Sequence, residues 1–299
     1  MNRKDKQKKA APGAVASARE AGDTPGAVLG TLFGVGVGPG DPGLVTLAAA
    51  EVIRRVPTVA YPVHKQGAGS RALETVRGLL AAGVTLLPLL MPMTKDSRRL
   101  NQAHDAASRD LVRTAADGRD VAYLSLGDPL FYSTFGYLAE RFPGPVKVIS
   151  GVSAMSATAA ALGQPLAAGD TPLAIVTGRD HKALEKALEM DASVVILKPR
   201  SLSRRSLELI GRTCGWERAC AAIELGGPEQ QVIAPLDAEQ AASLPYFAVM
   251  WIRPAARPDR QPQEEDRPAE ETESRPAGRE DLDLQAENSP GQETAEAGK

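Results

Sequence analysis

The residue types that most suggest chemistry lie in a glycine-rich stretch near the start of the chain. Gly34, Gly36 and Gly38 alternate with apolar residues, and the run ends in a Pro-Gly-Asp-Pro turn at 39–42. Glycine has no side chain, so another backbone or a flat ligand can come close to these positions. The stretch fits a dinucleotide fingerprint poorly, because Pro39 lacks the N–H that a phosphate cradle would use and Asp41 repels phosphate. We interpret it as a strand-to-helix turn for a ligand other than a pyrophosphate.

A second turn of this kind follows a predicted strand that ends at Leu126. Gly127, Asp128 and Pro129 form the turn, and helical periodicity begins about Phe131. In open α/β sheets, ligands bind at the carboxyl ends of strands, which is where this turn falls. Asp128 either accepts hydrogen bonds from a ribose or an amine, or caps the helix that follows.

A third stretch is a predicted helix whose first two turns are small on every face. Its small residues are Ser153, Ala154, Ser156, Ala157 and Ala159. Small side chains allow either close packing of the helix against a sheet or room for a flat ligand beside the helix N-terminus. The sequence leaves both interpretations open.

The elements that must position these stretches are short β-rich runs alternating with longer helical patterns. The predicted strands are residues 32–37, 58–61, 85–90, 121–126, 146–149, 173–177 and 193–197. The predicted helices are residues 44–55, 70–81, 97–116, 131–141, 153–162, 182–189 and 202–213. Such alternation indicates βαβ units and a mostly parallel sheet. After Trp216 only turns separate the runs at 219–225, 231–234 and 246–253, which indicates antiparallel pairing.

We therefore expect an α/β protein with two lobes, at 30–145 and 146–253, the second built on a mixed sheet. Residues 1–29 are rich in Ala, Gly and Lys without periodicity, and we expect a disordered arm there. Residues 254–299 hold 13 Asp or Glu against 6 Lys or Arg, with no Val, Ile, Phe, Tyr, Trp or Met. Such a segment buries too little apolar surface to offset its ordering entropy, so we expect a disordered acidic tail.

Charge, hydropathy and cysteine content narrow the class of protein further. Residues 31–253 hold 23 basic and 21 acidic side chains, and this balance argues against a nucleic-acid partner. No run reaches the roughly 18 apolar residues that a membrane span needs, so we expect no membrane partner. Cys214 and Cys220 have no metal-site spacing, and we expect no metal site and a cytoplasmic location, where cysteines stay reduced.

Taken together, the motifs resemble the tetrapyrrole (corrin/porphyrin) methylase family over residues 30–253. The matching segments are V-G-V-G-P-G-D-P-G-L at 35–44, A-Y-P-V at 60–63, P-M-T at 92–94, G-D-P-L-F-Y-S-T-F at 127–135 and S-G-V-S-A-M-S-A-T-A-A at 150–160. The first turn is specific for the family. The segments at 92–94 and 127–134 are typical of the branch that methylates C20 of precorrin-2 or cobalt-factor II in cobalamin biosynthesis.

The resemblance implies two αβα lobes with S-adenosylmethionine held in the cleft between them, and a homodimer. Matched position by position, the residues implied to contact this cofactor are Pro39, Leu126, Gly127, Asp128, Tyr132, Ser133, Ser153, Ala154, Leu197 and Lys198. Ala221 and Pro245 fall near further contact regions of the family. Two positions depart from the family pattern, because Leu126 replaces a glycine or a polar residue and Lys198 replaces a methionine that some members place against the adenine.

No His, Cys and carboxylate constellation is apparent in the core, and the implied chemistry does not require one. A sulfonium methyl donor is already activated, a reduced tetrapyrrole supplies its own nucleophilic carbon, and in-line positioning alone can lower a barrier by ~7–11 kcal/mol. The candidates to accept the proton that later leaves the methylated carbon are Asp41, Tyr61 and His64. The candidates to orient the carboxylates of the substrate are Lys65, Arg98, Arg99 and Arg179, although the sequence favours a solvated surface position for each of them.

Three alternatives remain from the sequence. The first is a methyltransferase of the same family that acts at another corrin position, on diphthamide or on ribosomal RNA, although the near-neutral core disfavours RNA. The second is a nicotinamide-binding oxidoreductase that uses the glycine turn, which Pro39 and Asp41 disfavour. The third is a cofactor-binding scaffold without catalytic activity.

Overall fold

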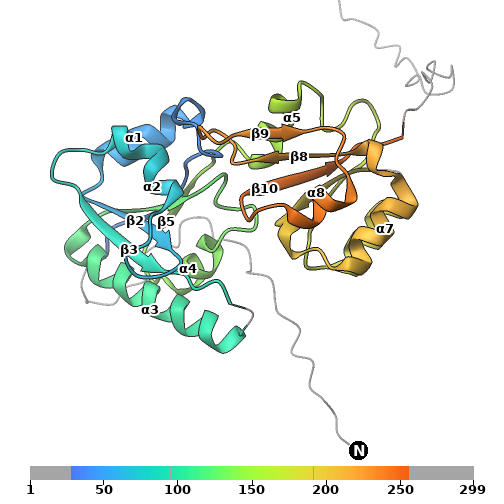
Figure 1. Cartoon of the computed structure of the whole chain (residues 1–299). Coiled ribbons are helices and arrows are strands. Elements are labelled where there is room, and N and C mark those ends of the chain that lie inside the picture. The colour runs from blue at the N-terminus through green and yellow to red at the C-terminus, as the bar shows by residue number, and fades with distance from the viewer. Residues whose placement is uncertain (1–27, 95, 191, 256–299) are drawn as a thin grey trace, which may run out of the picture. The chain divides into compact units, whose positions relative to one another are not determined.

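The structure is a computed structural model that describes residues 28–94, 96–190 and 192–255 (Figure 1). The predicted disordered segments, 1–29 and 254–299, lie outside these residues apart from two residues at the inner end of each. In the described part of the chain, the strands form two five-stranded sheets.

All strands of the first sheet are parallel, in the order β3-β2-β4-β1-β5. The strands are β1 (Leu32–Gly36), β2 (Thr58–Val63), β3 (Thr85–Leu90), β4 (Val121–Ser125) and β5 (Val146–Ile149). The α-helices of this part are α1 (Leu47–Arg55), α2 (Arg71–Val76), α3 (Ser97–Ala115) and α4 (Phe135–Arg141). Short 3-10 helices lie at Pro42–Leu44, Arg77–Leu79 and Ala116–Gly118.

Helices cover both faces of the first sheet, α1 and α2 on one side and α3 and α4 on the other (Figure 1). Val35 of β1 packs in a cluster with Ile53 of α1, whereas its neighbour Leu32 packs in a second cluster with Leu111 of α3. A strand covered on both faces needs small or apolar residues throughout, which is why β1 is buried along its whole length.

The second sheet is mixed, in the order β6-β7-β10-β8-β9. Its strands are β6 (Leu173–Thr177), β7 (Ser193–Leu197), β8 (Ala219–Ile223), β9 (Gln231–Ile233) and β10 (Ala248–Ile252). β6 and β7 are parallel, whereas β10 is antiparallel to both β7 and β8, and β9 is antiparallel to β8. The α-helices are α5 (Ala154–Leu162), α6 (His181–Glu189), α7 (Arg204–Cys214) and α8 (Ala238–Ser243), with 3-10 helices at Pro199–Ser201 and Trp216–Arg218.

Each face of the second sheet is also covered. Met155 and Ala157 of α5 pack with Val195 and Trp251 on one face. The other face packs against α6, α7 and α8, where Leu184, Ile210 and Ala241 join the largest apolar cluster. The Trp251 indole N–H donates to the Ser193 hydroxyl at 2.7 Å, which satisfies its polar group inside the sheet.

The predicted α/β class with a mixed second sheet is confirmed. Several elements are shorter than predicted, above all α2, which ends at Val76 rather than at residue 81. Three further differences have a physical reason. α4 begins at Phe135 rather than at residue 131, because Tyr132 has a left-handed φ of 52° that interrupts a helix. β5 pairs with β1, so the first sheet extends past residue 145, where the first lobe was predicted to end. α8 was not predicted because six residues are too few to show helical periodicity, although Asp237 and Gln240 form a capping box at its start.

No helix in the described ranges is both long and apolar enough to span a bilayer.

Candidate functional site

The three motif stretches meet through three glycines. A Cβ built on Gly36 would lie 2.5 Å from the Gly151 nitrogen, and one built on Gly151 would lie 2.3 Å from the Gly127 oxygen. Distances this short exclude any larger residue at Gly36 and Gly151. Gly36 of β1 and Gly151 of the loop before α5 therefore serve the close approach of another backbone, which was one of the two interpretations of the glycine run. Gly34 of β1 instead makes room for the Phe135 ring, because a Cβ built on it would lie 2.3 Å from that side chain.

Backbone hydrogen bonds tie the two Gly-Asp-Pro turns directly to each other. The Gly127 N–H donates to the Gly38 oxygen at 2.7 Å, and the Gly38 N–H donates to the Gly127 oxygen at 3.2 Å. This isolated antiparallel bridge lies just beyond the ends of the parallel strands β1 and β4. The two turns are therefore paired at the carboxyl ends of adjacent parallel strands, the edge where open α/β sheets bind ligands.

Asp128 is buried, and its carboxylate connects two backbone segments. One oxygen accepts from the Leu130 N–H at 2.8 Å, and the other accepts from the Gly151 N–H at 3.0 Å. The side chain is 8% exposed. Asp128 does not cap the following helix, one of its two predicted roles, because α4 starts seven residues later. It instead holds the loop before α5 against the second turn.

Asp41 has the opposite setting. It is exposed, and one carboxylate oxygen accepts from the Gly43 N–H at 2.7 Å at the start of the 3-10 helix Pro42–Leu44. Pro39, two residues earlier, is buried. Asp41 therefore shapes the turn through one oxygen only.

Sequence reasoning missed the partner of this first turn, which is the loop after β8. A Cβ built on Gly40 would lie 2.4 Å from the Leu225 oxygen, and one built on Gly226 would lie 2.1 Å from the Asp41 nitrogen. Both glycines have positive φ, 145° for Gly40 and 73° for Gly226. The signal available in the sequence was Gly-Gly at 226–227, directly after the strand predicted over 219–225.

The loop that follows Asp128 contacts both sheets. The Tyr132 hydroxyl donates to the Ile175 oxygen of β6 at 3.4 Å, while the Ser133 hydroxyl hydrogen-bonds the Ser125 hydroxyl at the end of β4 at 2.7 Å. Ser133 also accepts from the Phe135 N–H at 3.1 Å, so it caps the first turn of α4. The Tyr132 side chain is 50% exposed.

Ser153 and Ala154 begin α5 beside the second turn. The Ser153 hydroxyl accepts from the Ser156 N–H at 3.1 Å, as an N-cap does. A Cβ on Gly127 would lie 3.9 Å from the Ala154 nitrogen, so the helix N-terminus adjoins the turn. Close helix–sheet packing is present at Ala157, which is buried against the second sheet, while Ser153 and Ala154 stay partly accessible.

Leu197 and Lys198 end β7, next to the end of β6. The Gly178 N–H donates to the Leu197 oxygen at 2.9 Å, and Lys198 has a left-handed φ of 56°. Burial, and to a smaller extent the neighbouring Arg179 guanidinium, lower the pKa of the Lys198 ammonium. Of the ion pairs found among the described residues, none involves Lys198 or Arg179.

In the described part of the chain, no hydrogen bond or ion pair joins the remaining candidates to one another. Tyr61 lies partly buried on β2, and His64 is exposed one residue past the end of that strand. Lys65 is exposed nearby, and Arg98 and Arg99 are exposed in the first turn of α3. Ala221 is fully buried inside the core of the second sheet, and Pro245 is partly accessible. Within the described ranges, no group of three or more His, Cys, Asp or Glu is placed to hold a metal ion.

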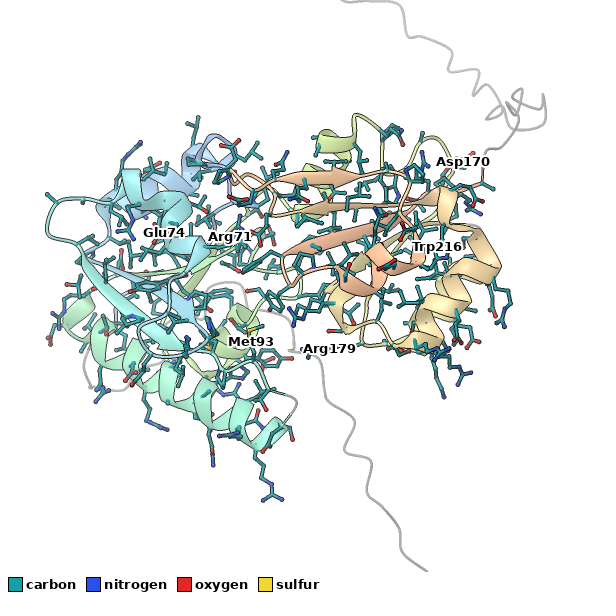
Figure 2. The ribbon with its side chains drawn as sticks, in the orientation of Figure 1. Arg71, Glu74, Met93, Asp170, Arg179 and Trp216 are labelled. Carbon is teal, nitrogen blue, oxygen red and sulfur yellow. The ribbon has the colours of Figure 1, made fainter. Side chains whose placement is uncertain are left out.

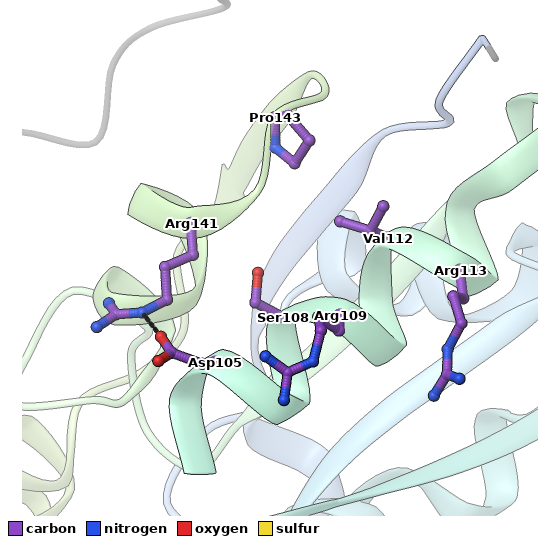
Figure 3. A pocket seen from close by; sticks show the side chains of 7 residues that line it. All are labelled: Asp105, Ser108, Arg109, Val112, Arg113, Arg141 and Pro143. Atoms are coloured by element: carbon purple, nitrogen blue, oxygen red, sulfur yellow. Dashed lines mark hydrogen bonds and ion pairs between the residues drawn. The ribbon is translucent and has the colours of Figure 1, made fainter. Parts of the chain in front are cut away.

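An open pocket lies apart from this site, between α3 and α4 (Figure 3). It has a volume of about 570 Å³ and is lined by Asp105, Ser108, Arg109, Val112, Arg113, Arg141 and Pro143. Arg141 donates to Asp105 at 2.8 Å, and Arg113 pairs with Asp110. None of the predicted site residues lines it, so we assign no ligand to this pocket.

The carboxyl ends of several parallel strands carry the candidate site. β8 runs parallel to β6 and β7, because β10 is antiparallel to both β7 and β8. Lys198 and Leu225 therefore follow strand ends on the same edge of the second sheet. The contacts of Gly40 with Leu225, and of Tyr132 with Ile175, join that sheet to the loops at the carboxyl ends of β1 and β4.

The donor set suits a nucleoside without phosphates. It consists of the hydroxyls of Ser153 and Tyr132, the backbone at Gly127, and the apolar side chains of Leu126 and Leu197, whereas Pro39 removes an N–H from the glycine turn. S-Adenosylmethionine has an amino-acid end, a ribose and an adenine but no phosphate. The residues present therefore fit this group.

The fold is that of a two-lobed α/β protein, with the candidate site at the carboxyl ends of parallel strands. The chain belongs to the family of Tetrapyrrole (Corrin/Porphyrin) Methylases, whose family model matches residues 31–242.

Two relatives and one solved structure illustrate this membership. The chain is 32% identical over 243 residues to a precorrin-2 C(20)-methyltransferase of Sinorhizobium sp, covering 76% of this chain and 96% of the relative. It is 37% identical over 177 residues to a probable cobalt-precorrin-2 C(20)-methyltransferase of Methanocaldococcus jannaschii, covering 58% and 74%. A uroporphyrin-III C-methyltransferase from Thermus thermophilus, solved in complex with S-adenosylhomocysteine, has the same fold, with a TM-score of 0.54, 19% identity and coverage of 75% and 97%.

Proposed function

We propose that this protein transfers a methyl group from S-adenosylmethionine to C20 of precorrin-2, or of its cobalt-containing counterpart cobalt-factor II, in cobalamin biosynthesis. The observation that carries the proposal is the junction of Gly36, Gly127 and Gly151, which unites the three family motifs at one strand edge. The names of the two C(20)-methyltransferase relatives supply the position of methylation.

The proposed cofactor site uses the residues that the family resemblance implied. Pro39, Gly127 and Asp128 would form its walls through backbone and turn geometry, since both Asp128 carboxylate oxygens already accept hydrogen bonds from backbone N–H groups. Tyr132, Ser133 and Ser153 would supply hydroxyls. The apolar and small contacts, together with one amine, would come from Leu126, Ala154, Leu197 and Lys198.

When bound, S-adenosylmethionine supplies a methyl group on a positively charged sulfur that leaves as a neutral thioether. The protein then has to hold the C20 carbon of the substrate in line with the sulfur–methyl bond and exclude water, which accounts for the scarcity of acid–base residues at the site. A base must remove the proton from the methylated carbon. Among the three candidates, Asp41 lies in the motif turn itself and has one carboxylate oxygen without a hydrogen bond from the described residues.

The carboxylates of the substrate would be oriented by cations at the edges of the site. Lys65, Arg98, Arg99 and Arg179 are exposed, and none of them forms an ion pair with another described residue. Arg179 follows the strand end next to Lys198, which makes it the candidate with the clearest structural connection to the site.

Two further properties are part of the proposal. A homodimer follows from the family resemblance, and sedimentation equilibrium of the full chain would test it. A reducing cytoplasmic location fits the two free cysteines, Cys214 and Cys220, which are both buried.

The direct test is a turnover assay with S-adenosylmethionine and each of the two substrates. We expect a methylated product whose new methyl group is assigned to C20 by nuclear magnetic resonance, with one substrate preferred over the other. Methylation at a different carbon would place the protein elsewhere in the family. Absence of product with both substrates, in a preparation that binds S-adenosylhomocysteine, would reject the C20 assignment.

A further inference from the structure

Arg71, the first residue of α2, reaches from the first sheet's helices to the loop after β8. Its guanidinium forms an ion pair with Glu224 and donates to the Leu225 oxygen at 3.4 Å. The same group lies 5.1 Å from the centre of the Phe247 ring, within the range of a cation–π interaction. These three contacts link the start of α2 to the loop after β8 and to Phe247, the residue before β10.

The Arg71 guanidinium lies where two backbone turns touch. A Cβ built on Gly40 would be 3.1 Å from its Nη2 atom, and a Cβ built on Gly227 would also be 3.1 Å from it. These glycines belong to the motif turn after β1 and to the loop after β8. Thr75, one helical turn further along α2, provides a second link, because its hydroxyl donates to the Gly40 oxygen at 3.5 Å.

One residue at this junction, Glu224, has a strained backbone conformation. Glu224 has a φ of 51°, a left-handed conformation that costs free energy for a residue with a side chain. Its N–H donates to the Phe247 oxygen at 2.9 Å, and its oxygen accepts from the Gly227 N–H at 3.1 Å. The ion pair with Arg71 adds a side-chain restraint to the same strained residue.

Arg71 is also much less accessible than a surface arginine of the same region. Its side chain is 27% exposed and that of Glu224 is 26% exposed, whereas Arg77, which pairs with Glu74, is 59% exposed. Burial lowers the pKa of the Arg71 guanidinium. Figure 2 labels Arg71 and Glu74 on the same segment, and the two ion pairs provide a matched comparison.

We propose that Arg71 is a positioning residue that, through Glu224 and Phe247, holds the 39–41 turn against Leu225 and Gly226 and thereby sets the affinity for the cofactor. Arg71 acts on the site through these backbone segments and does not itself contact the cofactor. The inference rests on the proposed use of the 39–41 turn in binding S-adenosylmethionine.

The first measurement uses the cofactor-free full chain. In Arg71→Gln, we expect amide hydrogen exchange to accelerate at residues 40–43 and 225–227, while exchange in β4 and β7 is unchanged. The control is Arg77→Gln, which removes the same kind of charge from an exposed pair and should change exchange at neither segment. Equal acceleration in both variants, or none in Arg71→Gln, would overturn the proposal.

The second measurement is the dissociation constant of S-adenosylhomocysteine by calorimetry. We expect Arg71→Gln to weaken binding about tenfold, the ratio that corresponds to loss of roughly 1.4 kcal/mol, with kcat at saturating S-adenosylmethionine within about twofold of wild type. Arg71→Lys keeps the charge but loses the forked geometry, so its dissociation constant should lie between those of wild type and Arg71→Gln. Should Arg71→Gln fail to fold, Arg71→Lys and Glu224→Gln carry the test.

Coupling between the partners provides the remaining control. If Arg71 acts through Glu224, adding Glu224→Gln to Arg71→Gln should weaken binding by much less than the product of the single effects. Multiplicative effects would mean that Arg71 does not act through Glu224, and a lowered melting temperature with unchanged affinity would mean that the pair is merely structural; either result would overturn the proposal. Failure of the wild-type chain to bind S-adenosylhomocysteine would instead reject the proposed function and is recognised separately from these outcomes.

Discussion

The aspartates of the two Gly-Asp-Pro turns, Asp41 and Asp128, have different surroundings, and we infer different roles for them. Asp128 is buried and both of its oxygens accept backbone N–H groups. Asp41 is exposed and uses one oxygen to bind the Gly43 N–H. A carboxylate with an uncommitted oxygen at a motif turn can accept a proton, whereas one fully engaged by the backbone holds the loop in place.

We predict that Asp41→Asn lowers kcat without changing cofactor affinity. The amide oxygen can still accept from the Gly43 N–H, so the turn is preserved, but the side chain no longer accepts a proton. Loss of a general base typically costs ~10²–10⁴-fold in rate. Single-turnover rates and calorimetric titration with S-adenosylhomocysteine would separate the two effects.

Tyr61→Phe and His64→Gln are the comparison variants for this measurement. The proton acceptor is the residue whose replacement reduces the rate of the chemical step. A wild-type rate in Asp41→Asn would remove Asp41 from the mechanism.

Lys198 carries a charge in a partly buried position, and we predict a pH-dependent effect of Lys198→Met on stability. Burial lowers the Lys198 pKa in the folded protein, so between that value and the ordinary lysine pKa of about 10.4 the unfolded chain binds more protons. Wild-type stability therefore gains from this group as pH rises through that window. Lys198→Met should be more stable than wild type near neutrality, and its advantage should shrink at alkaline pH.

Urea unfolding of both proteins at several pH values measures this, because titration of all other groups cancels in the difference. Lys182→Met, at an exposed position in the first turn of α6, is the control for removing a lysine from the surface. An advantage that grows with pH would contradict the prediction.

At the scale of elements, the ends of β1 and β4 and the start of α5 form one packed unit. Gly36 ends β1 and touches the backbone of Gly151. We predict that Gly36→Ala destabilises the protein by at least ~1–3 kcal/mol, because its Cβ would overlap backbone that cannot rotate away. Gly78→Ala is the control, since Gly78 has open space around its Cβ and no positive φ.

Denaturant unfolding monitored by circular dichroism gives both values. A Gly36→Ala variant as stable as Gly78→Ala would show that the junction can open at little cost.

The sequence predicted the strands well because alternation of apolar runs with helical periodicity is a local signal. It misplaced the start of α4 because Tyr132 adopts a left-handed backbone that no tyrosine signals in advance. It also missed the contact of Gly40 with Leu225, since the pairing of loops distant in the chain has no local pattern. The two Gly-Asp-Pro turns could be predicted because their residue types and their positions after strands are visible in the sequence. The hydrogen bond from the Gly151 N–H to Asp128 could not, because it joins residues that only the fold brings together.

For the whole molecule, both sheets lie inside residues 32–252. We predict that a chain ending at Ala255 keeps the melting temperature and turnover of the full chain, because every described strand and helix is retained. Differential scanning calorimetry and the C20 assay provide the comparison. A lowered melting temperature or rate in the shortened chain would assign a role to residues 256–299.

The position of β10 has a consequence for how the chain is made. All five strands of the first sheet precede residue 150, so that sheet has its full set of partners when half of the chain has been synthesised. The second sheet is different, because its central strand, β10, is the last in sequence and pairs with β7 on one side and β8 on the other. During synthesis, which proceeds from the N-terminus, β6 with β7 and β8 with β9 therefore stay two separate pairs until Ile252 has emerged. Until then, the edges of β7 and β8 that later pair with β10 stay unpaired, and unpaired strand edges can pair with other nascent chains.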